Sequence, residues 1–472
     1  MANRTTVAMM LLLAGCSMQP DYVRPTLPTA STYPADVQTG VAGRPAVEIG
    51  WRAFFGDPRL QALIATALEN NRDLRAAVAR IAEARAQYRI QRADQLPSVE
   101  ATGSATRSRT PIGSAGIGTT PGAPTGAAVT ANRYSITAQV PSFELDFWGR
   151  VRSLTEAARA SYLSTAAAQR AFRISLIGDV ATAYLVDREL GERIELAQRT
   201  LRARQEGLEI AKLRLDAGVT SALDYRQTET LLTQAQTELA ALQRQRAQNR
   251  NALEVLIGGM LPADLPPPMP LEQQGISDRI APGLPSDLLT NRPDIIAAEE
   301  QLRAANANIG AARAAFFPQI SLTGLLGFAS SELGSLFGED GLTWSFGPNL
   351  ALPIFDAGRN RANLSLAEAR RDIAVADYER TVQTAFREVA DALAGRRWLA
   401  EQLQAQERAL AAQRDRAELA RLRYRNGVAN YLEVLDAERE LFAAEQQLVQ
   451  ARRELLANAV SLYAALGGGL TP

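Results

Sequence analysis

The stretch LRLDAGV at residues 213–219 returns 209 residues later as LRYRNGV at residues 422–428. In each stretch a glycine follows a run of helix-forming residues, and a glycine there ends a helix by adopting the left-handed conformation. Both stretches lie inside long segments without proline, residues 142–261 and 354–471. Because a proline in a helix interior costs about 3 kcal/mol, these segments predict two long helical hairpins that turn at the two glycines.

The repeated heptapeptide belongs to a tandem duplication of most of the chain. The same separation of 209 residues relates further pairs: Gly149 to Gly358, Arg150 to Arg359, Leu232 to Leu441 and Gly258 to Gly467. Nearer the N-terminus the separation becomes 221 residues, as for Asn70 and Asn291 and for Pro97 and Pro318. The change means that the first copy carries an insertion, which we place in the Gly/Thr/Ala-rich stretch from about Thr110 to Thr130.

Each copy also contains segments in which apolar and polar residues alternate with the period of a β-strand. Three sets alternate in this way: Tyr134, Ile136, Ala138 and Val140 with Ser135, Thr137 and Gln139; Leu342, Trp344 and Phe346 with Thr343, Ser345 and Gly347; and Ile320 and Leu322 with Ser321 and Thr323. We predict one β-hairpin in each copy, at about residues 97–148 and about residues 318–355. Strands with one apolar face are typical of transmembrane β-barrels, the smallest of which have about eight strands. Since four strands would not close a barrel, the sequence predicts an oligomer.

The predicted fold is mainly α with a β-barrel part, built from a duplicated helix-hairpin-helix-helix unit. At about 1.5 Å per residue, a helix over residues 150–217 would reach roughly 100 Å, and helices over residues 59–95 and 220–256 roughly 55 Å each. Two shorter helices end to end therefore match one long helix, as in the wall of a helical cylinder. The chain then divides into a signal peptide (1–15), a lipid-anchored extended arm (16–58), a first repeat (59–260), a Pro-rich linker (261–286), a second repeat (287–468) and a C-terminal tail (469–472).

The N-terminus has the pattern of a short secretory signal, with Arg4 before an apolar run from Val7 to Leu13. The string LAGC at residues 13–16 is similar to a bacterial lipobox, in which Cys16 is acylated and becomes the first residue of the mature protein. The alternative is a plain signal peptide that happens to contain a cysteine. No later stretch reaches the roughly 18 uninterrupted apolar residues of a transmembrane helix. We therefore expect a covalent lipid on Cys16 and no other cofactor.

The composition excludes several functional classes. The chain has 51 basic and 51 acidic residues, one cysteine and no histidine. Without histidine there is no imidazole for a Ser/His or Cys/His couple and no zinc site built on histidine. Zero formal net charge argues against a nucleic-acid partner, and no isolated pair of carboxylates indicates a glycosidase. We predict no catalytic residues, no metal site and no enzymatic activity.

The order and spacing of the short motifs resemble those of the outer-membrane factors of tripartite efflux systems, the TolC-like channel-tunnels, and most closely their lipidated OprM-like branch. The motifs are the lipobox at Cys16, WRAFFGDP at 51–58, NRPD at 291–294, FP at 317–318, FDAGR at 355–359 and YLEVLDA at 431–437. The resemblance implies a homotrimer with a 12-stranded barrel in the outer membrane of a Gram-negative bacterium. It also implies that a long α-helical barrel, continuous with the strands, projects into the periplasm.

The resemblance further implies partners and a function. The chain would be the passive exit duct of a pump, receiving drugs, solvents, dyes or metal ions from an inner-membrane resistance-nodulation-division pump through a periplasmic adaptor, a membrane fusion protein. The alternative is a periplasmic coiled-coil lipoprotein that serves as a scaffold or adaptor without forming a pore. The alternating hairpins favour the channel, because a soluble adaptor has no use for outward-facing Trp344 and Phe346.

A periplasmic gate is expected at the helix turns. By resemblance, Asp436 is the carboxylate whose three symmetry copies ring the pore, and Leu432 is the apolar constriction beside it. Three converging carboxylates would repel one another and attract cations. Asp224 and Tyr424 match residues that latch neighbouring helix pairs, with Glu433 as the repeat counterpart of Asp224. Where some relatives have a latching arginine, this chain has Ala429.

A simpler interpretation of the two aspartates stays open. An acidic residue in the first turns of a helix is stabilised by the helix dipole by about 0.3–1 kcal/mol without any role in a pore, and this applies to Asp224 and Asp436. The residues around the two turns are our candidates for adaptor docking: Arg214, Gly218, Val219, Arg423, Gly427 and Val428.

Overall fold

The computed structural model describes residues 17–27, 29–30, 32–33, 43–111, 128–277, 280–281 and 283–471. The predicted signal peptide, Cys16 and most of the predicted insertion lie outside these residues. The described chain forms two compact units. The first is drawn from Met1–Pro25, Ala82–Ser164 and Glu299–Ala376, and the second from Thr26–Ile81, Thr165–Ala298 and Asp377–Pro472.

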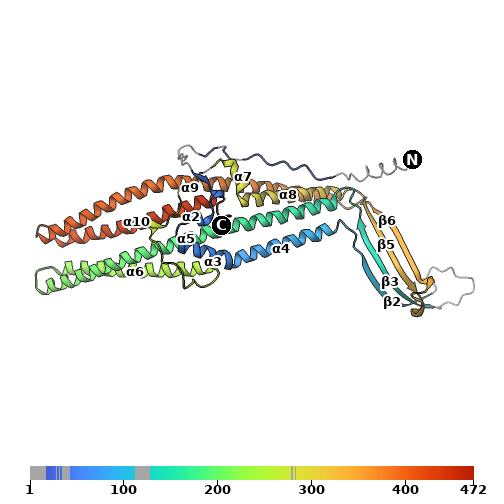
Figure 1. Ribbon diagram of the computed structural model, residues 1–472, viewed down its shortest axis with the longest axis horizontal. Helices are drawn as coiled ribbons and strands as arrows, with labels where there is room; N and C mark the ends of the chain where they lie inside the picture. The colour runs from blue at the N-terminus through green and yellow to red at the C-terminus, as the bar shows by residue number, and fades with distance from the viewer. Residues whose placement is uncertain are drawn as a thin grey trace, which may run out of the picture. The chain divides into compact units, whose positions relative to one another are not determined.

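The first unit contains a four-stranded antiparallel sheet. Its strands lie side by side in the order β2-β3-β5-β6 (Figure 1). Their bounds are β2 Glu100–Pro111, β3 Ala128–Glu144, β5 Gln319–Ser330 and β6 Leu342–Ala351. The β2–β3 and β5–β6 pairs are the two hairpins, and the β3–β5 pairing joins the two copies of the duplication. β2 and β6 therefore form the two edges of the sheet.

The two faces of this sheet differ in polarity, as the alternation predicted. Trp344 pairs with Leu326, which pairs with Ala138, so apolar residues lie in one row across three strands. Trp344 is 72% exposed in the single chain. On the opposite face the hydroxyl oxygens of Thr102 and Thr137 lie 2.9 Å apart. One face is thus suited to an apolar environment and the other to water.

Aromatic contacts fix the end of the first hairpin to the start of the second. The rings of Trp148 and Phe317 stack with their centroids 4.7 Å apart. The indole N–H of Trp148 donates to the carbonyl oxygen of Pro318 at 2.8 Å. Because both partners of Trp148 come from the FP motif, this short motif joins the two copies where the strands begin.

The described N-terminal arm lies along α8 (Pro293–Ala314). Its Arg24 guanidinium forms an ion pair with Glu299 at 2.7 Å. At Gly310 an added Cβ would lie 2.8 Å from the Cα of Gln19. The arm therefore approaches the helix closely because the Arg24–Glu299 ion pair holds it there and because Gly310 has no side chain in its path.

The second unit is built on two helical hairpins, α5 with α6 and α9 with α10 (Figure 1). Their bounds are α5 Arg150–Asp216, α6 Ala222–Ile257, α9 Arg359–Arg425 and α10 Tyr431–Ala465, and α5 and α9 also contribute to the first unit. The side-chain amide of Asn249 donates to the Ala183 carbonyl at 2.8 Å, and that of Asn458 donates to the Ala392 carbonyl at 2.9 Å. Both members of the second bond lie 209 residues after those of the first. The duplication is therefore preserved in contacts as well as in sequence.

The WRAFFGDP motif, which holds α2 (Trp51–Phe54), supplies part of the core of the second unit. Phe54 is fully buried and stacks on Tyr463 with the ring centroids 4.0 Å apart. Asp57 caps α3 (Pro58–Asn70) and also accepts a hydrogen bond from the Tyr184 hydroxyl at 2.6 Å. Burial, together with this bond, raises the pKa of Tyr184. The motif thus fixes the start of the first repeat against α5 and α10.

The segment 59–95 holds two helices, α3 and α4 (Arg72–Ala93), where the sequence analysis expected one. Asn71 causes the interruption. Its side-chain oxygen accepts from the Leu74 N–H at 2.8 Å, and its side-chain nitrogen donates to the Leu256 carbonyl at 2.8 Å. These bonds begin α4 and hold it against the end of α6. They are more favourable than the backbone bonds of one continuous helix through Asn71.

Short elements complete the described chain. β1 (Arg44–Pro45) pairs in parallel with β4 (Ile280–Ala281), and α7 (Leu288–Asn291) precedes α8. The remaining elements are 3₁₀ turns at Ala46–Glu48, Leu271–Gln273, Pro285–Asp287, Leu333–Ser335 and Glu339–Gly341. Among the described residues, no helix combines the length and the apolar character that crossing a membrane requires. The fold is thus mainly α and tandemly duplicated, with one two-faced sheet.

Candidate functional site

The two helical hairpins turn through the same backbone conformation. Gly218 and Gly427 have φ angles of 72° and 71°, in the left-handed region that favours glycine. In both turns the residue after the glycine donates its N–H back to the helix, as in a Schellman motif. These bonds are Val219 N–H to the Arg214 carbonyl and Val428 N–H to the Arg423 carbonyl, both at 3.0 Å. The turns lie at the glycines that the sequence analysis singled out.

The side chains at the two turns fall into two groups. Val219 and Val428 are 63% and 66% exposed, so each presents apolar surface. The arginines are engaged within the tips. Arg423 pairs with Glu433 at 3.2 Å, and Arg214 donates to the hydroxyl of Tyr424. Of the residues predicted to dock an adaptor, the valines are therefore the more available.

The Arg214–Tyr424 contact joins the tips of the two hairpins. Arg214 lies in the last turn of α5 and Tyr424 in the last turn of α9, and the guanidinium carbon lies 5.5 Å from the centre of the tyrosine ring. The Tyr424 ring also packs against Tyr431, with the centroids 5.0 Å apart. Arg214 and Tyr424 thus form a contact between the two hairpins that does not involve Ala429.

Asp224 lies in a helix cap. Its carboxylate accepts from the Ser221 hydroxyl at 2.8 Å and from the Thr220 hydroxyl at 2.9 Å. With the return bond to the Ser221 side chain, this is a capping box at the start of α6. The hydrogen bond from Ser221, followed by that from Thr220, lowers the pKa of Asp224. Its counterpart Glu433 starts α10 similarly, by donating its N–H to the side chain of Asn430 at 3.1 Å.

Asp436 is held by two arginines of the same chain. Its carboxylate oxygens accept from Arg416 of α9 and from Arg439 of α10, each at 2.5 Å. The sequence analysis treated Asp436 as an isolated carboxylate that would repel its symmetry copies. Arg439 also pairs with Glu440 at 3.1 Å, so the structure gives a cluster of two carboxylates and two guanidinium groups, with a formal charge of 0 in place of −1. The expected repulsion is therefore offset within each chain.

These arginines were missed by sequence reasoning, although a signal exists for both. Arg439 lies three residues after Asp436, which places the two side chains on one face of a helix. Arg416 and Asp436 lie 11 and 9 residues from Gly427, on opposite arms of the hairpin. Antiparallel helices that turn at this glycine bring such positions side by side.

Leu432 lies beside this cluster and is 50% exposed. A groove of about 280 Å³ runs between α6 and α10, lined by Gln227, Thr230, Leu231, Gln234, Leu432, Leu435, Asp436 and Arg439. The α6 side supplies amide and hydroxyl groups, and the α10 side supplies leucines and charges. An apolar side chain and a compensated carboxylate are thus presented together, one helical turn apart.

The fold and the tips together define a class. A two-faced sheet with two open edges, joined to long paired helices that end in capped turns, is the architecture of a subunit of an outer-membrane channel with a helical tunnel. The family model for "Outer membrane efflux protein" matches residues 63–259 and 284–468, one segment in each copy of the duplication. The chain belongs to this family.

Individual relatives agree with this assignment. The chain is 46% identical over 461 residues to the probable efflux pump outer membrane protein TtgC of Pseudomonas putida, which covers 97% of this chain and 93% of the relative. It is 44% identical over 464 residues to the outer membrane protein OprJ of Pseudomonas aeruginosa, which covers 97% and 94%. The open state of the MtrE outer membrane channel of Neisseria gonorrhoeae has a TM-score of 0.86 at 40% identity, over 97% of this chain and 99% of that one. The resemblance to the TolC-like outer-membrane factors is confirmed, and the chain is an exit duct for efflux in the outer membrane.

Proposed function

We propose that three copies of the chain close into the outer-membrane duct of a tripartite pump that exports toxic organic molecules. The observation that carries the assembly is the sheet with two unpaired edges, β2 and β6, in the described chain. Lipid leaves no backbone group unpaired, and known barrels have at least about eight strands. Three sheets joined edge to edge give 12 strands, with Trp344 and its row toward the lipid and the threonine hydroxyls toward the lumen.

The substrate class follows from the named relatives. Proteins of Pseudomonas putida that are 45–46% identical to this chain are named for toluene, solvent and antibiotic efflux. The duct itself performs no chemistry in this proposal, so energy and selection come from an inner-membrane pump and a periplasmic adaptor. Val219 and Val428 are the proposed apolar contacts for the adaptor. These outer-membrane relatives also favour the duct over the scaffold or adaptor alternative.

The lipid anchor is a further part of the proposal. Acylation of Cys16 would place the lipid one residue before Ser17, where the described arm begins. The ion pair between Arg24 and Glu299 then holds the arm on α8. Each buried methylene of an acyl chain contributes about 0.8 kcal/mol, so several chains would anchor the duct durably.

The gate is proposed at the helical tips. Leu432 would form the apolar constriction, and the cluster of Asp436 with its two arginines would form the charged ring beside it. The Arg214–Tyr424 contact would hold the two hairpins of one chain together in the closed state. Adaptor docking at the exposed valines would then compete with these contacts.

The membrane orientation of the sheet tests the proposal most directly. Trp344→Arg should impair insertion and the heat-modifiable trimer, because an arginine that faces lipid costs up to about 2–4 kcal/mol, depending on its depth in the bilayer. Ser345→Arg is the matched control, one residue along on the other face, and should retain both. The measurements are outer-membrane fractionation, gel mobility with and without heating, and accumulation of a toluene-like solvent or an antibiotic in a strain lacking the native gene. Equal loss in both variants, or normal insertion of Trp344→Arg, would refute the assignment of the faces.

A further inference from the structure

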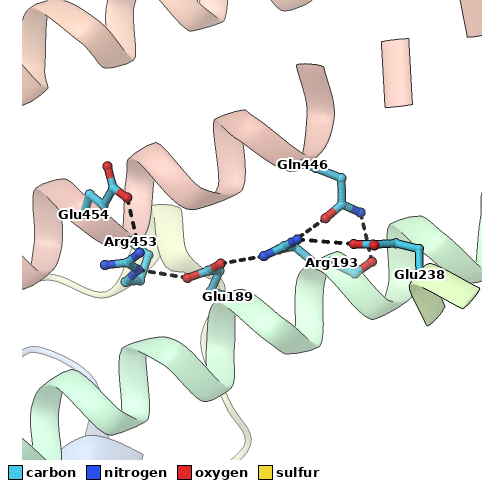
Figure 2. Close-up of polar contacts among 6 residues, drawn as sticks. All are labelled: Glu189, Arg193, Glu238, Gln446, Arg453 and Glu454. Atoms are coloured by element: carbon cyan, nitrogen blue, oxygen red, sulfur yellow. Dashed lines mark hydrogen bonds and ion pairs between the residues drawn. The ribbon is translucent and has the colours of Figure 1, made fainter. Parts of the chain in front are cut away.

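A polar network ties the two copies of the duplication together inside one chain. Glu189 of α5 accepts from Arg193 at 3.0 Å and from Arg453 of α10 at 2.8 Å (Figure 2). Arg193 also donates to the side-chain oxygen of Gln446 at 2.5 Å and reaches Glu238 of α6 at 3.4 Å. The Gln446 amide donates back to the Arg193 carbonyl at 3.3 Å. Side chains of α5, α6 and α10 therefore meet in one joint.

This joint has a counterpart in the sequence that a single chain does not assemble. The duplication relates α5 to α9, which lies 209 residues later, and α10 to α6, which lies 209 residues earlier. The contact between α5 and α10 therefore corresponds to a contact between α9 and α6. The counterparts are Trp398 for Glu189, Gln402 for Arg193, Thr237 for Gln446 and Arg244 for Arg453. In a ring of repeats, α9 of one chain would meet α6 of the next chain, as α5 meets α10 within a chain.

The exposure of the four counterparts fits an uncovered surface. Glu189 and Gln446 are buried, and Arg193 and Arg453 are partly buried. All four counterparts are exposed in the single chain, and Trp398 is 52% exposed although it is a large aromatic residue. The template joint is therefore filled from two helices, whereas the contacts of its duplicate come from neighbours on the same helix: Arg397 lies over one face of the Trp398 ring at 4.4 Å, and Arg244 donates to Gln248 at 3.3 Å.

We infer that Trp398 and Gln402 on α9 form a docking surface for a second copy of the chain, whose α6 presents Thr237 and Arg244. This inference rests on the homotrimer proposed above and names the side chains of the helical seam between its subunits. An arginine over the face of an indole is attracted by the ring quadrupole, so Arg244 takes a π-face in place of the carboxylate that holds Arg453. Gln402 and Thr237 supply a hydrogen-bonding pair beside it.

The two kinds of seam are consequently unequal. The seam within a chain contains the buried carboxylate of Glu189, which binds two arginines, and the more exposed carboxylate of Glu238. The seam between chains contains neither at the matching positions, which are Trp398 and Gln447. An ion-pair joint weakens as salt rises, and a cation–π joint does so less.

Cross-linking distinguishes the two seams. The full-length duct would carry Trp398→Cys and Arg244→Cys and would be treated in native outer membranes with a short bismaleimide, of a length that spans an arginine–carboxylate pair. This treatment should give covalent dimers and trimers. The matched control is Glu189→Cys with Arg453→Cys, whose link lies within one chain and should give no covalent oligomer. Predominant inter-chain products from the control pair would overturn the inference. A normal native trimer without inter-chain product from the Trp398/Arg244 pair would also overturn the inference. Absence of a trimer even in the unsubstituted chain would instead overturn the proposed homotrimer.

A substitution that copies the template provides a second measurement. Trp398→Glu should make the seam between chains resemble the seam within a chain, so the trimer should dissociate at a higher temperature at low salt and lose this gain at high salt. Adding Arg244→Gln should cancel the gain. The single variant Trp398→Glu and the double variant Trp398→Glu with Arg244→Gln are then compared. If both lower the dissociation temperature of the trimer equally, Arg244 does not face position 398 and the inference fails.

Discussion

At the first helical tip Asp224 belongs to the cap of its own helix, whereas at the second tip Asp436 is bound by arginines from both arms of the hairpin. The backbone of the two turns is nevertheless the same, with left-handed glycines at φ angles of 72° and 71°. Duplication has thus preserved the geometry of the turn while the charges around it have diverged. The comparison indicates a structural role for both tips and is the reason why we propose the gate at the second.

The largest expected effect would come from removing the charge that distinguishes the second tip. Asp436→Ala should raise single-channel conductance severalfold, because the constriction loses a side chain and its tie to Arg416. It should also shift ion selectivity toward anions, since Arg416 loses its counter-charge and Arg439 keeps only that of Glu440. Asp224→Ala is the control and should change neither property. Planar-bilayer recordings of both variants check this, and an equal response of the two aspartates would break the comparison.

The second prediction tests what the two tips share. Gly218→Ala and Gly427→Ala should each lower the free energy of unfolding by about 1–2 kcal/mol, because a side chain in the left-handed region is strained. Nothing lies within 4 Å of the added Cβ at either position, so the cost is in the backbone alone and should be equal. Gly259→Ala, which also meets open space but without positive φ, should change the stability by less than about 0.5 kcal/mol. Denaturant unfolding in detergent measures all three, and clearly unequal losses at the two tips would mean that the turns differ energetically.

The third prediction concerns the contact between the tips. Tyr424→Phe removes the hydrogen bond from Arg214 and keeps the ring, which should cost about 0.5–1.5 kcal/mol. Tyr431→Phe is a matched control, because its ring packs in the same pair. Hydrogen exchange of the peptides that contain the two turns should become faster in Tyr424→Phe than in Tyr431→Phe. The same rate in both would show that the hydroxyl does not hold the tips together.

The smallest expected effect is a pH dependence confined to the first tip. The cap lowers the pKa of Asp224 below the usual aspartate value of about 3.9. Its stabilising contribution is therefore complete above about pH 5 and is lost as the pH falls below about 4, through the lowered pKa. Hydrogen exchange around Ser221 should accelerate over this range, and Asp224→Asn should remove the dependence. An unchanged profile in Asp224→Asn would attribute the transition to another group.

Patterns that are local in sequence predicted most of the fold. The two glycine turns and the two-faced hairpins follow from residues within a few positions of one another, and the structure has them at those positions. The break at Asn71 was missed, yet it was available from the duplication. Arg72 is matched by Pro293, 221 residues later, and a proline there forces a new helix to begin.

The charge pairs could not be obtained in the same way. The Arg214–Tyr424 contact depends on how the two hairpins lie against each other, which no periodicity within one hairpin fixes. Of the partners of Asp436, Arg439 lies three residues away on the same helix and could have been predicted, whereas Arg416 depends on the register of α9 against α10, which the position of Gly427 sets only approximately. The predicted roles of Leu432, Glu433 and the docking valines concern other chains and stay predictions.

The pairing of β3 with β5 has a consequence for the origin of the molecule. This pairing is antiparallel, like the pairing of the two strands within each hairpin. Neighbouring hairpins therefore pair with each other in the same way as the two strands of one hairpin. A shorter ancestral polypeptide with a single hairpin could then have built the proposed twelve-strand barrel from six identical chains. Fusion of two such genes halves the number of chains and frees alternate boundaries to evolve separately.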